Sequence, residues 1–192
     1  FGYEHFRVGQ EEIITEIINR RPVLAVLPTG AGKSLCFQLP SLLMEGITLV
    51  ISPLISLMKD QAEALKARGI GAAYLDSCLN SNEYGRILYD TLNGKVKFLY
   101  VAPERLANPQ FISFAKRANI TLVAVDEAHC VSQWGHSFRK DYYNIPSFIE
   151  NLPKRPLVAA FTATATEEVR RDILSRLQII TAKEVLSGAD RP

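Results

Sequence analysis

Residues 22–34 read Pro-Val-Leu-Ala-Val-Leu-Pro-Thr-Gly-Ala-Gly-Lys-Ser, and this stretch decides the fold. The apolar run Pro22–Leu27 predicts a buried strand, and the segment Lys33–Met44 predicts a helix. A strand, a Gly-rich turn and a helix in this order are typical of a phosphate-binding loop, in which N–H groups at the start of the helix bind phosphate oxygens. The stretch therefore predicts an α/β fold with a nucleotide site.

Several residues of this loop have an expected role. Gly30 and Gly32 let the backbone turn tightly toward the phosphates, and Lys33 is expected to contact the β- and γ-phosphates. The usual pattern begins with Gly, whereas this chain has Leu27, and this departure narrows the class of nucleotide-binding protein. A chance Gly-rich turn after a strand is the alternative to a phosphate loop. The predicted nucleotide site consists of Thr29, Gly30, Ala31, Gly32, Lys33 and Ser34, with the Ser34 hydroxyl as a ligand of Mg²⁺.

Apolar runs alternate with helix-like segments along the rest of the chain. Further strands are predicted at Ile47–Ser52, Ala72–Leu75, Val96–Val101, Thr121–Asp126 and Leu157–Thr162. Further helices are predicted at Gly9–Asn19, Ile55–Ala67, Asn82–Asn93, Gln110–Ala118 and Glu167–Leu177. This alternation predicts a mainly parallel sheet with helices on both faces, and a ligand site at the carboxyl ends of its strands.

An acidic pair follows one of the predicted strands. Residues 121–129 read Thr-Leu-Val-Ala-Val-Asp-Glu-Ala-His, so an apolar strand carries Asp126 and Glu127 at its end. Asp126 is expected to hold Mg²⁺ through water, because Mg²⁺ keeps much of its hydration in proteins. Glu127 is expected to position and deprotonate an attacking water. A solvated acidic turn is the alternative.

Composition narrows the class of protein. A chain of 192 residues with 47% hydrophobic residues suits one α/β domain and excludes a disordered chain. No apolar run could span a membrane and no signal peptide is recognisable, so a cytoplasmic or nuclear location without a membrane partner is expected. A net charge of +2 gives no global sign of nucleic-acid binding. Cys36, Cys78 and Cys130 are far apart and predict neither a zinc site nor a disulfide.

Residues 130–139 read Cys-Val-Ser-Gln-Trp-Gly-His-Ser-Phe-Arg and follow the acidic motif directly. This stretch resembles the aromatic-rich loop of RecQ-family DNA helicases, and the resemblance to the first RecA-like motor domain of that family covers essentially the whole chain. It implies that the loop contacts DNA and reports its presence to the ATP site, with flat rings for bases and Arg for phosphate. An aromatic cluster filling the core is the alternative. The implied DNA-contacting residues are Gln133, Trp134, His136, Phe138 and Arg139.

The same resemblance assigns residues on either side of the phosphate loop. Residues 1–10, Phe-Gly-Tyr-Glu-His-Phe-Arg-Val-Gly-Gln, resemble the adenine-recognition motif of the family. The resemblance implies that Tyr3 flanks the base, that Gln10 hydrogen-bonds its edge and that Arg7 supports the site. His129 is implied to act with Lys33, Asp126 and Glu127 and to link them to the rest of the motor. In residues 160–166, Thr162 and Thr164 are implied to bond to the acidic motif, and Thr166 is placed to cap a helix.

Two further motifs match the family. Residues 51–61 resemble a strand-to-helix turn that touches the DNA backbone, which implies phosphate contacts for Ser52, Ser56 and Lys59. A helix cap with a solvated face is the alternative for each of these residues. Residues 100–106 match another motif, and its Arg105 is either structural or faces DNA.

The family resemblance implies the partners of the chain. These are ATP, Mg²⁺, single-stranded or forked DNA, and a second RecA-like domain that supplies an arginine to the ATP site. Residues 1–187 are expected to form the ATP-binding domain, and residues 188–192 to begin the linker to that second domain. The chain is then a piece of a longer protein that binds ATP but hydrolyses it poorly alone. The alternatives are an RNA-dependent ATPase of the DEAD-box kind and a nucleotide-dependent binding module.

Overall fold

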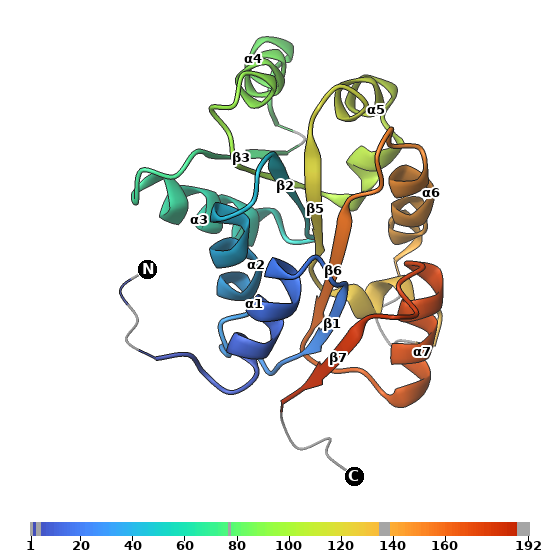
Figure 1. Ribbon diagram of the computed structural model, residues 1–192. Helices are drawn as coiled ribbons and strands as arrows, with labels where there is room; N and C mark the ends of the chain where they lie inside the picture. The colour runs from blue at the N-terminus through green and yellow to red at the C-terminus, as the bar shows by residue number, and fades with distance from the viewer. Residues whose placement is uncertain (1, 3–4, 77, 135–138, 188–192) are drawn as a thin grey trace.

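A single seven-stranded sheet organises the protein. The computed structural model describes residues 2, 5–76, 78–134 and 139–187. Every strand pairing in this part of the chain is parallel, and the strand order is β3-β4-β2-β5-β6-β1-β7 (Figure 1). The mainly parallel sheet expected from the sequence is thus confirmed. The strands are β1 (Val23–Val26), β2 (Ile47–Ile51), β3 (Ala72–Leu75), β4 (Phe98–Val101), β5 (Ile120–Val125), β6 (Leu157–Thr162) and β7 (Lys183–Leu186).

Helices cover both faces of this sheet (Figure 1). One face carries α1 (Gln10–Ile18), α2 (Lys33–Leu42) and α3 (Ile55–Lys66), and most of their buried apolar residues belong to one core cluster. The other face carries α4 (Ser81–Leu92), α5 (Pro109–Ala115), α6 (Asn144–Glu150) and α7 (Glu167–Arg176). Short 3₁₀ helices are η1 (Pro103–Ala107), η2 (Ala128–Val131) and η3 (Lys140–Tyr143). None of the helices in the described ranges is long and apolar enough to cross a bilayer.

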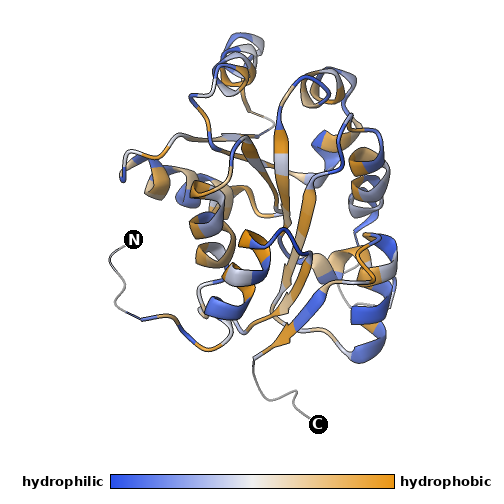
Figure 2. Ribbon diagram, in the orientation of Figure 1, coloured by the Kyte–Doolittle hydropathy of each residue, from blue (hydrophilic) through white to orange (hydrophobic). Residues whose placement is uncertain are grey.

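The strands are apolar on both sides because each side faces a core. In β1, Leu24 and Val26 belong to the core under α4–α7, whereas Val23 and Ala25 belong to the core under α1–α3. Alternate side chains of a strand point to opposite faces, so a strand between two helical layers has no polar side. Figure 2 shows this pattern as hydrophobic strands between helices with hydrophilic outer faces. Burial on both sides of the sheet is the main stabilisation of the fold.

Besides the short 3₁₀ helices, the structure contains one strand and one α-helix that the sequence did not predict. The strand β7 carries charged Lys183 and Glu184, and it pairs only with β1 at the edge of the sheet. An edge strand with two exposed charges lacks the apolar run by which the other strands were recognised. The helix α6 is short and contains Pro146, which in sequence reads as a break.

Parallel strands give the sheet two different edges. The segments that follow the carboxyl ends of the strands form the carboxyl edge, which includes the turn at residues 27–32 and the start of η2. The segments that lead into the strands form the amino edge. The amino edge consists of seven turns, at residues 19–22, 43–46, 67–71, 93–97, 116–119, 151–156 and 178–182.

Candidate functional site

The phosphate loop runs from Pro28 to Gly32, between β1 and α2. Gly30 and Gly32 have φ angles of 78° and 80°, a left-handed backbone that glycine adopts without strain. A Cβ atom on Gly32 would lie 2.5 Å from Nε2 of Gln10, so a larger residue here would displace the Gln10 amide. No side chain caps α2, so N–H groups of its first turn remain available for an anion.

Lys33 begins α2 and lies against the loop. Its Nζ donates to the carbonyl oxygen of Leu27 at 3.1 Å, and the Pro28 carbonyl lies 3.5 Å away. The positive charge of Lys33 favours the ionised forms of both Asp126 and Glu127, although burial raises the pKa of Asp126 overall. Ser34 follows in the first turn of α2 and is partly buried. The structure therefore brings the phosphate loop and the acidic pair into one site, as expected for strands whose carboxyl ends share an edge.

Gln10 has its amide group fully engaged within the protein. It is 3% exposed, its Nε2 donates to the Ala31 carbonyl at 2.9 Å, and its Oε1 accepts from the backbone N–H of Arg7 at 2.9 Å. The Arg7 guanidinium donates to the carbonyl of Gly30. Both residues thus tie the segment before α1 to the phosphate loop. A contact of Gln10 with adenine stays a prediction, and Tyr3 lies outside the described residues.

Asp126 directly follows β5, and both oxygens of its carboxylate accept hydrogen bonds. Oδ2 accepts from the Ser52 hydroxyl at 3.1 Å, and Oδ1 accepts from the backbone N–H of Glu127 at 3.0 Å. Burial, and next the neighbouring charge of Glu127, raise the pKa of Asp126 above its usual value. A buried carboxylate with a raised pKa is stabilised by a cation. The site therefore fits Mg²⁺, which proteins hold with one or two carboxylates beside substrate phosphates.

Glu127 and His129 form a pair next to Asp126. Glu127 has φ 49° and ψ 45°, a left-handed conformation that is uncommon for a residue with a side chain and is found at functional turns. Nδ1 of His129 lies 3.2 Å from Oε2 of Glu127. This hydrogen bond lowers the pKa of Glu127, and the charges of Lys33 and Arg139 act in the same direction. Glu127 is therefore ionised at neutral pH, as a proton acceptor must be.

A chain of hydrogen bonds continues from His129 into β6. Nδ1 of His129 lies 2.8 Å from Oγ1 of Thr162, whose hydroxyl donates to the Thr164 carbonyl at 3.1 Å. Because the Thr162 proton is used there, its oxygen accepts from the ring, so Nδ1 carries a proton. The expected bond from residues 160–166 to the acidic motif is therefore present for Thr162. Thr166 caps α7 by accepting from the N–H of Val169, which confirms the predicted cap.

The segment after the acidic motif presents an aromatic side chain to solvent. Trp134 is 65% exposed, so the alternative that it fills the core is excluded. Its backbone N–H donates to Oγ of the fully buried Ser132, which fixes the start of the segment. Gln133 and Arg139 are also exposed. His136 and Phe138 lie outside the described residues, so their contacts with DNA stay predictions.

The residues predicted to contact the DNA backbone differ in whether they are buried or exposed. Ser52 is 3% exposed and its hydroxyl is bound to Asp126, so the structure assigns it to the acidic site rather than to nucleic acid. Ser56 and Lys59 are exposed on α3 and remain candidates for phosphate contacts. Arg105 donates to the Asp76 carbonyl at 2.7 Å and lies over the ring of Tyr84, which makes its role structural.

Two residues of the site escaped the sequence analysis. The buried Tyr142 of η3 donates its hydroxyl to the backbone carbonyl of Asp126 at 2.9 Å, so it joins the end of the aromatic segment to the acidic pair. The thiol of buried Cys130 lies 3.7 Å from Nε2 of His129. Hydrogen bonds to Cys130 and to Glu127 raise the pKa of His129 to about 9. Neither role has a spacing in sequence that could have revealed it.

The sheet, the phosphate loop and the acidic pair define a RecA-like ATP-binding domain of the helicase class. The model of the DEAD/DEAH box helicase family matches residues 7–172. The chain belongs to this family, in which it is the first RecA-like domain of a RecQ-type member.

Curated proteins support this placement, and a solved structure shows the same fold. The ATP-dependent DNA helicase RecQ of Bacillus subtilis is 47% identical over the whole chain, and that of Haemophilus influenzae is 42% identical. The chain spans 32% and 31% of these two proteins, about a third of their length. A hypothetical ATP-dependent RNA helicase from Sulfolobus tokodaii has the same fold, with a TM-score of 0.73 at 20% identity over 95% of this chain and 53% of that one.

Proposed function

We propose that this domain is the ATP-binding half of a DNA helicase motor, which couples ATP hydrolysis to 3′-to-5′ movement along single-stranded or forked DNA. The observation that carries the proposal is the continuity of the acidic site with the exposed aromatic segment. Glu127, His129 and Thr162 are linked in one hydrogen-bonded chain, and Trp134 lies only a few residues further along the sequence. The curated relatives, named as ATP-dependent DNA helicases, favour DNA over RNA.

The residues of the site support hydrolysis of a bound nucleotide. Open N–H groups at the start of α2 and the ammonium of Lys33 would receive the phosphates. Ser34 and Asp126 would hold Mg²⁺, which supplies positive charge to the transferred phosphoryl group when it is bound. Glu127 would accept a proton from the attacking water, since its carboxylate is ionised and lies beside the protonated Nδ1 of His129.

Hydrolysis and DNA binding would be coupled through backbone contacts of the acidic motif. The hydroxyl of Tyr142 holds the carbonyl of Asp126, and the N–H of Arg139 bonds to the carbonyl of Cys130 at 3.3 Å. DNA that displaced the aromatic segment after the acidic motif would therefore shift the backbone at Asp126 and Glu127 through these two hydrogen bonds. A second RecA-like domain would complete the ATP site with an arginine, so this domain alone should hydrolyse ATP poorly.

ATP hydrolysis by the longer parent protein tests the proposal. We expect single-stranded DNA to stimulate hydrolysis, Lys33→Ala to abolish it, and Trp134→Ala to remove the stimulation while basal hydrolysis remains. Tyr89→Ala is the matched control, because Tyr89 is 64% exposed on α4, away from the site. Stimulation by RNA alone would replace the proposal with an RNA-dependent ATPase, and no stimulation by either polymer would leave a nucleotide-binding module.

A further inference from the structure

The amino edge of the sheet concentrates positive charge. Its seven turns contain one acidic residue, Glu45, and nine basic residues: Arg20, Arg21, Arg68, Lys95, Lys97, Lys116, Arg117, Lys154 and Arg155. The chain has 22 Lys and Arg and 20 Asp and Glu, so the rest of the molecule keeps 13 basic and 19 acidic residues. The net charge of +2 therefore conceals two regions of opposite sign.

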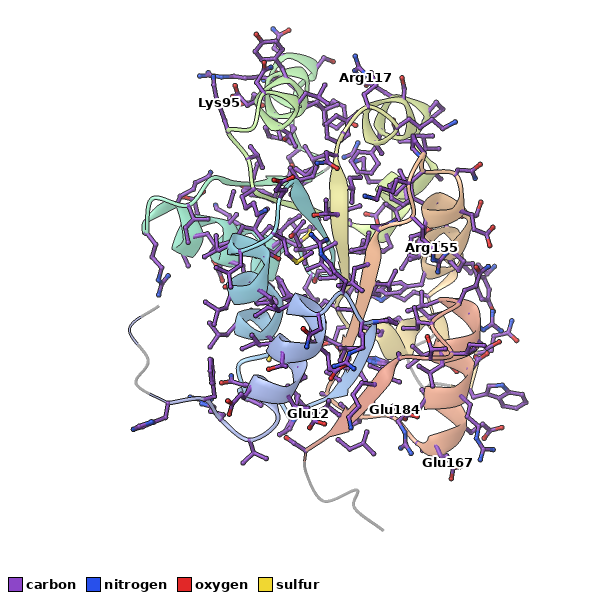
Figure 3. All side chains as sticks on the ribbon, viewed as in Figure 1. Glu12, Lys95, Arg117, Arg155, Glu167 and Glu184 are labelled. Carbon is purple, nitrogen blue, oxygen red and sulfur yellow. The ribbon has the colours of Figure 1, made fainter. Side chains whose placement is uncertain are left out.

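Figure 3 shows this separation across the molecule. Lys95 and Arg117 lie at the top of the view and Arg155 lies on its right side, whereas Glu12, Glu167 and Glu184 lie toward the bottom. The basic residues come from turns that are distant in sequence and meet only because every strand enters the sheet from the same side. The positive region is thus a product of the all-parallel topology.

Part of this region is hollowed into a groove. A hollow of about 710 Å³ lies between Arg20, Lys154 and Arg155. It adjoins a hollow of about 200 Å³ at Asn119 and Lys154, and that one adjoins a third of about 340 Å³ at Arg117 and Lys97. We call the three together the basic groove. Its charged lining consists of Arg20, Glu45, Lys97, Lys116, Arg117, Lys154 and Arg155, and Asn119 lines all three hollows.

Several cations of the groove have no protein partner. Lys97 donates to the carbonyls of Met44 and Gly46, and Arg155 donates to the Leu177 carbonyl at 3.0 Å. These two side chains therefore stabilise the fold. In contrast, four exposed side chains form no ion pair or hydrogen bond within the described ranges: Arg20, Lys116, Arg117 and Lys154. Four unpaired cations along one groove repel one another and leave room for an external polyanion.

We propose that the basic groove binds the phosphodiester backbone of nucleic acid, as a second contact on the edge opposite the ATP site. The arrangement favours a phosphate backbone over an acidic protein segment, because the cations follow a groove at intervals and Asn119 adds an uncharged donor among them. A protein partner would also need a cluster of apolar anchors, yet among the exposed large hydrophobic side chains of the described residues only Leu92, at 37% exposure, lines the groove.

The second contact goes beyond the proposed motor function and does not depend on ATP. Ser56, Lys59 and Trp134 follow carboxyl ends of strands, so one short nucleic acid cannot reach them and the groove at once without passing around the domain. Single-stranded and duplex segments of one substrate would meet different edges. Binding to the groove is therefore measurable on this chain alone, whether or not its parent hydrolyses ATP.

Fluorescence anisotropy of labelled DNA provides the test. Single strands and duplexes of about 20 nucleotides would be titrated with the 192-residue chain between roughly 50 and 200 mM salt. The test variant is Arg20→Ala/Arg117→Ala/Lys154→Ala. The matched control is Lys66→Ala/Arg86→Ala/Arg171→Ala, which removes three exposed cations from α3, α4 and α7 and so changes the net charge equally.

The two triple variants are expected to differ in DNA affinity and in its salt dependence. The groove variant should bind more weakly, and its salt dependence, as the slope of log K against log salt, should fall by roughly 2–3, because each phosphate contact contributes about 0.7–0.9. The control should keep the slope of the unchanged chain. Glu45→Gln, which removes the one carboxylate of the amino edge, should tighten binding. Weakening with one DNA form alone identifies that form as the occupant.

Three results would overturn the inference: equal slopes for the groove and control variants, unchanged DNA binding by the groove variant, or loss of binding to polyglutamate but not to DNA. Circular dichroism on each variant establishes that the chain remains folded. The motor proposal is tested separately by DNA-stimulated hydrolysis with Trp134→Ala, so either proposal can fail while the other stands.

Discussion

At the scale of single residues, the candidate site depends on polar groups that restrain one another. Asp126 is held by Ser52 and by the backbone of Glu127, and Glu127 is held by His129. The sequence predicted the charged members of this group, because their types and order are tied to phosphate chemistry. The sequence analysis predicted a DNA contact for Ser52, because the hydrogen bond between Ser52 and Asp126 joins residues 74 positions apart and has no local signal in the sequence.

The pair of His129 and Glu127 predicts a pH dependence of stability. Bonds to Cys130 and Glu127 raise the pKa of His129 to about 9 from 6.5, so its contribution is fully present below pH 6.5 and is lost as the pH rises through 9. We expect His129→Gln to cost on the order of 1–3 kcal/mol of unfolding free energy near pH 6 and much less near pH 10. Urea denaturation at both pH values measures the difference.

His5→Gln is the control for this prediction, because His5 is exposed and lies before the site. Its effect on unfolding should be small and the same at both pH values. A cost of His129→Gln that does not change with pH would show that the ring contributes through packing rather than through its charge.

At the scale of elements, the carboxyl edge holds the functional side chains in fixed positions because each of them follows a rigid strand. The strands β1, β2, β5 and β6 were predicted from apolar runs, and their order along the chain predicted that their ends would meet. The attachment of η3 to the end of β5 through Tyr142 was not predicted. A buried tyrosine in a short 3₁₀ helix has neither a helical nor a strand period to identify it.

Tyr142→Phe tests this attachment. The substitution keeps the buried ring and removes the hydroxyl that donates to the Asp126 carbonyl, which leaves a partly buried acceptor without that donor. We expect a loss of about 1–3 kcal/mol in unfolding free energy, and a lower rate of ATP hydrolysis in the parent protein. Chemical denaturation and an ATPase assay measure the two effects.

Tyr89→Phe is the matched substitution, since Tyr89 is 64% exposed and its hydroxyl is outside the site. It should leave both quantities unchanged. If Tyr142→Phe behaved in the same way, the bond between η3 and β5 would be irrelevant to the acidic pair.

At the scale of the whole molecule, the nucleotide site joins segments from both halves of the chain. The phosphate loop follows β1 and the acidic pair follows β5, while Gln10 and Arg7 bind the loop from the start of the chain. The fold class could be predicted because the alternation of elements is a global pattern. The charge difference between the two edges of the sheet could not be predicted from the sequence, because it depends on which turns lie on the same side of the sheet.

A ligand that joins these segments should stabilise the entire domain. At a concentration of about 100 times its dissociation constant, a ligand that binds only the folded state adds about 2.7 kcal/mol. We expect a non-hydrolysable ATP analogue with Mg²⁺ to raise Tm by roughly 5–11 °C for a domain of this size. Lys33→Ala should remove most of this rise, and chelation of Mg²⁺ should reduce it.

Lys66→Ala is the control, because Lys66 is exposed on α3 and pairs with Glu63 at the surface. Its Tm should respond to the analogue as that of the unchanged chain does. Differential scanning calorimetry provides both values, and a full rise in Tm with Lys33→Ala would exclude Lys33 from the phosphate site.

The position of β1 in the sheet has a consequence for synthesis of the protein on the ribosome. This strand lies between β6 and β7, and Val23 pairs with Ala159, which is made 136 residues later. At usual translation rates the first strand therefore waits on the order of 10 s for its neighbours. During that time its apolar residues and the phosphate loop behind them have no sheet to join. The nascent chain should depend on chaperones over this interval, and slow codons between the two strands should lower its yield.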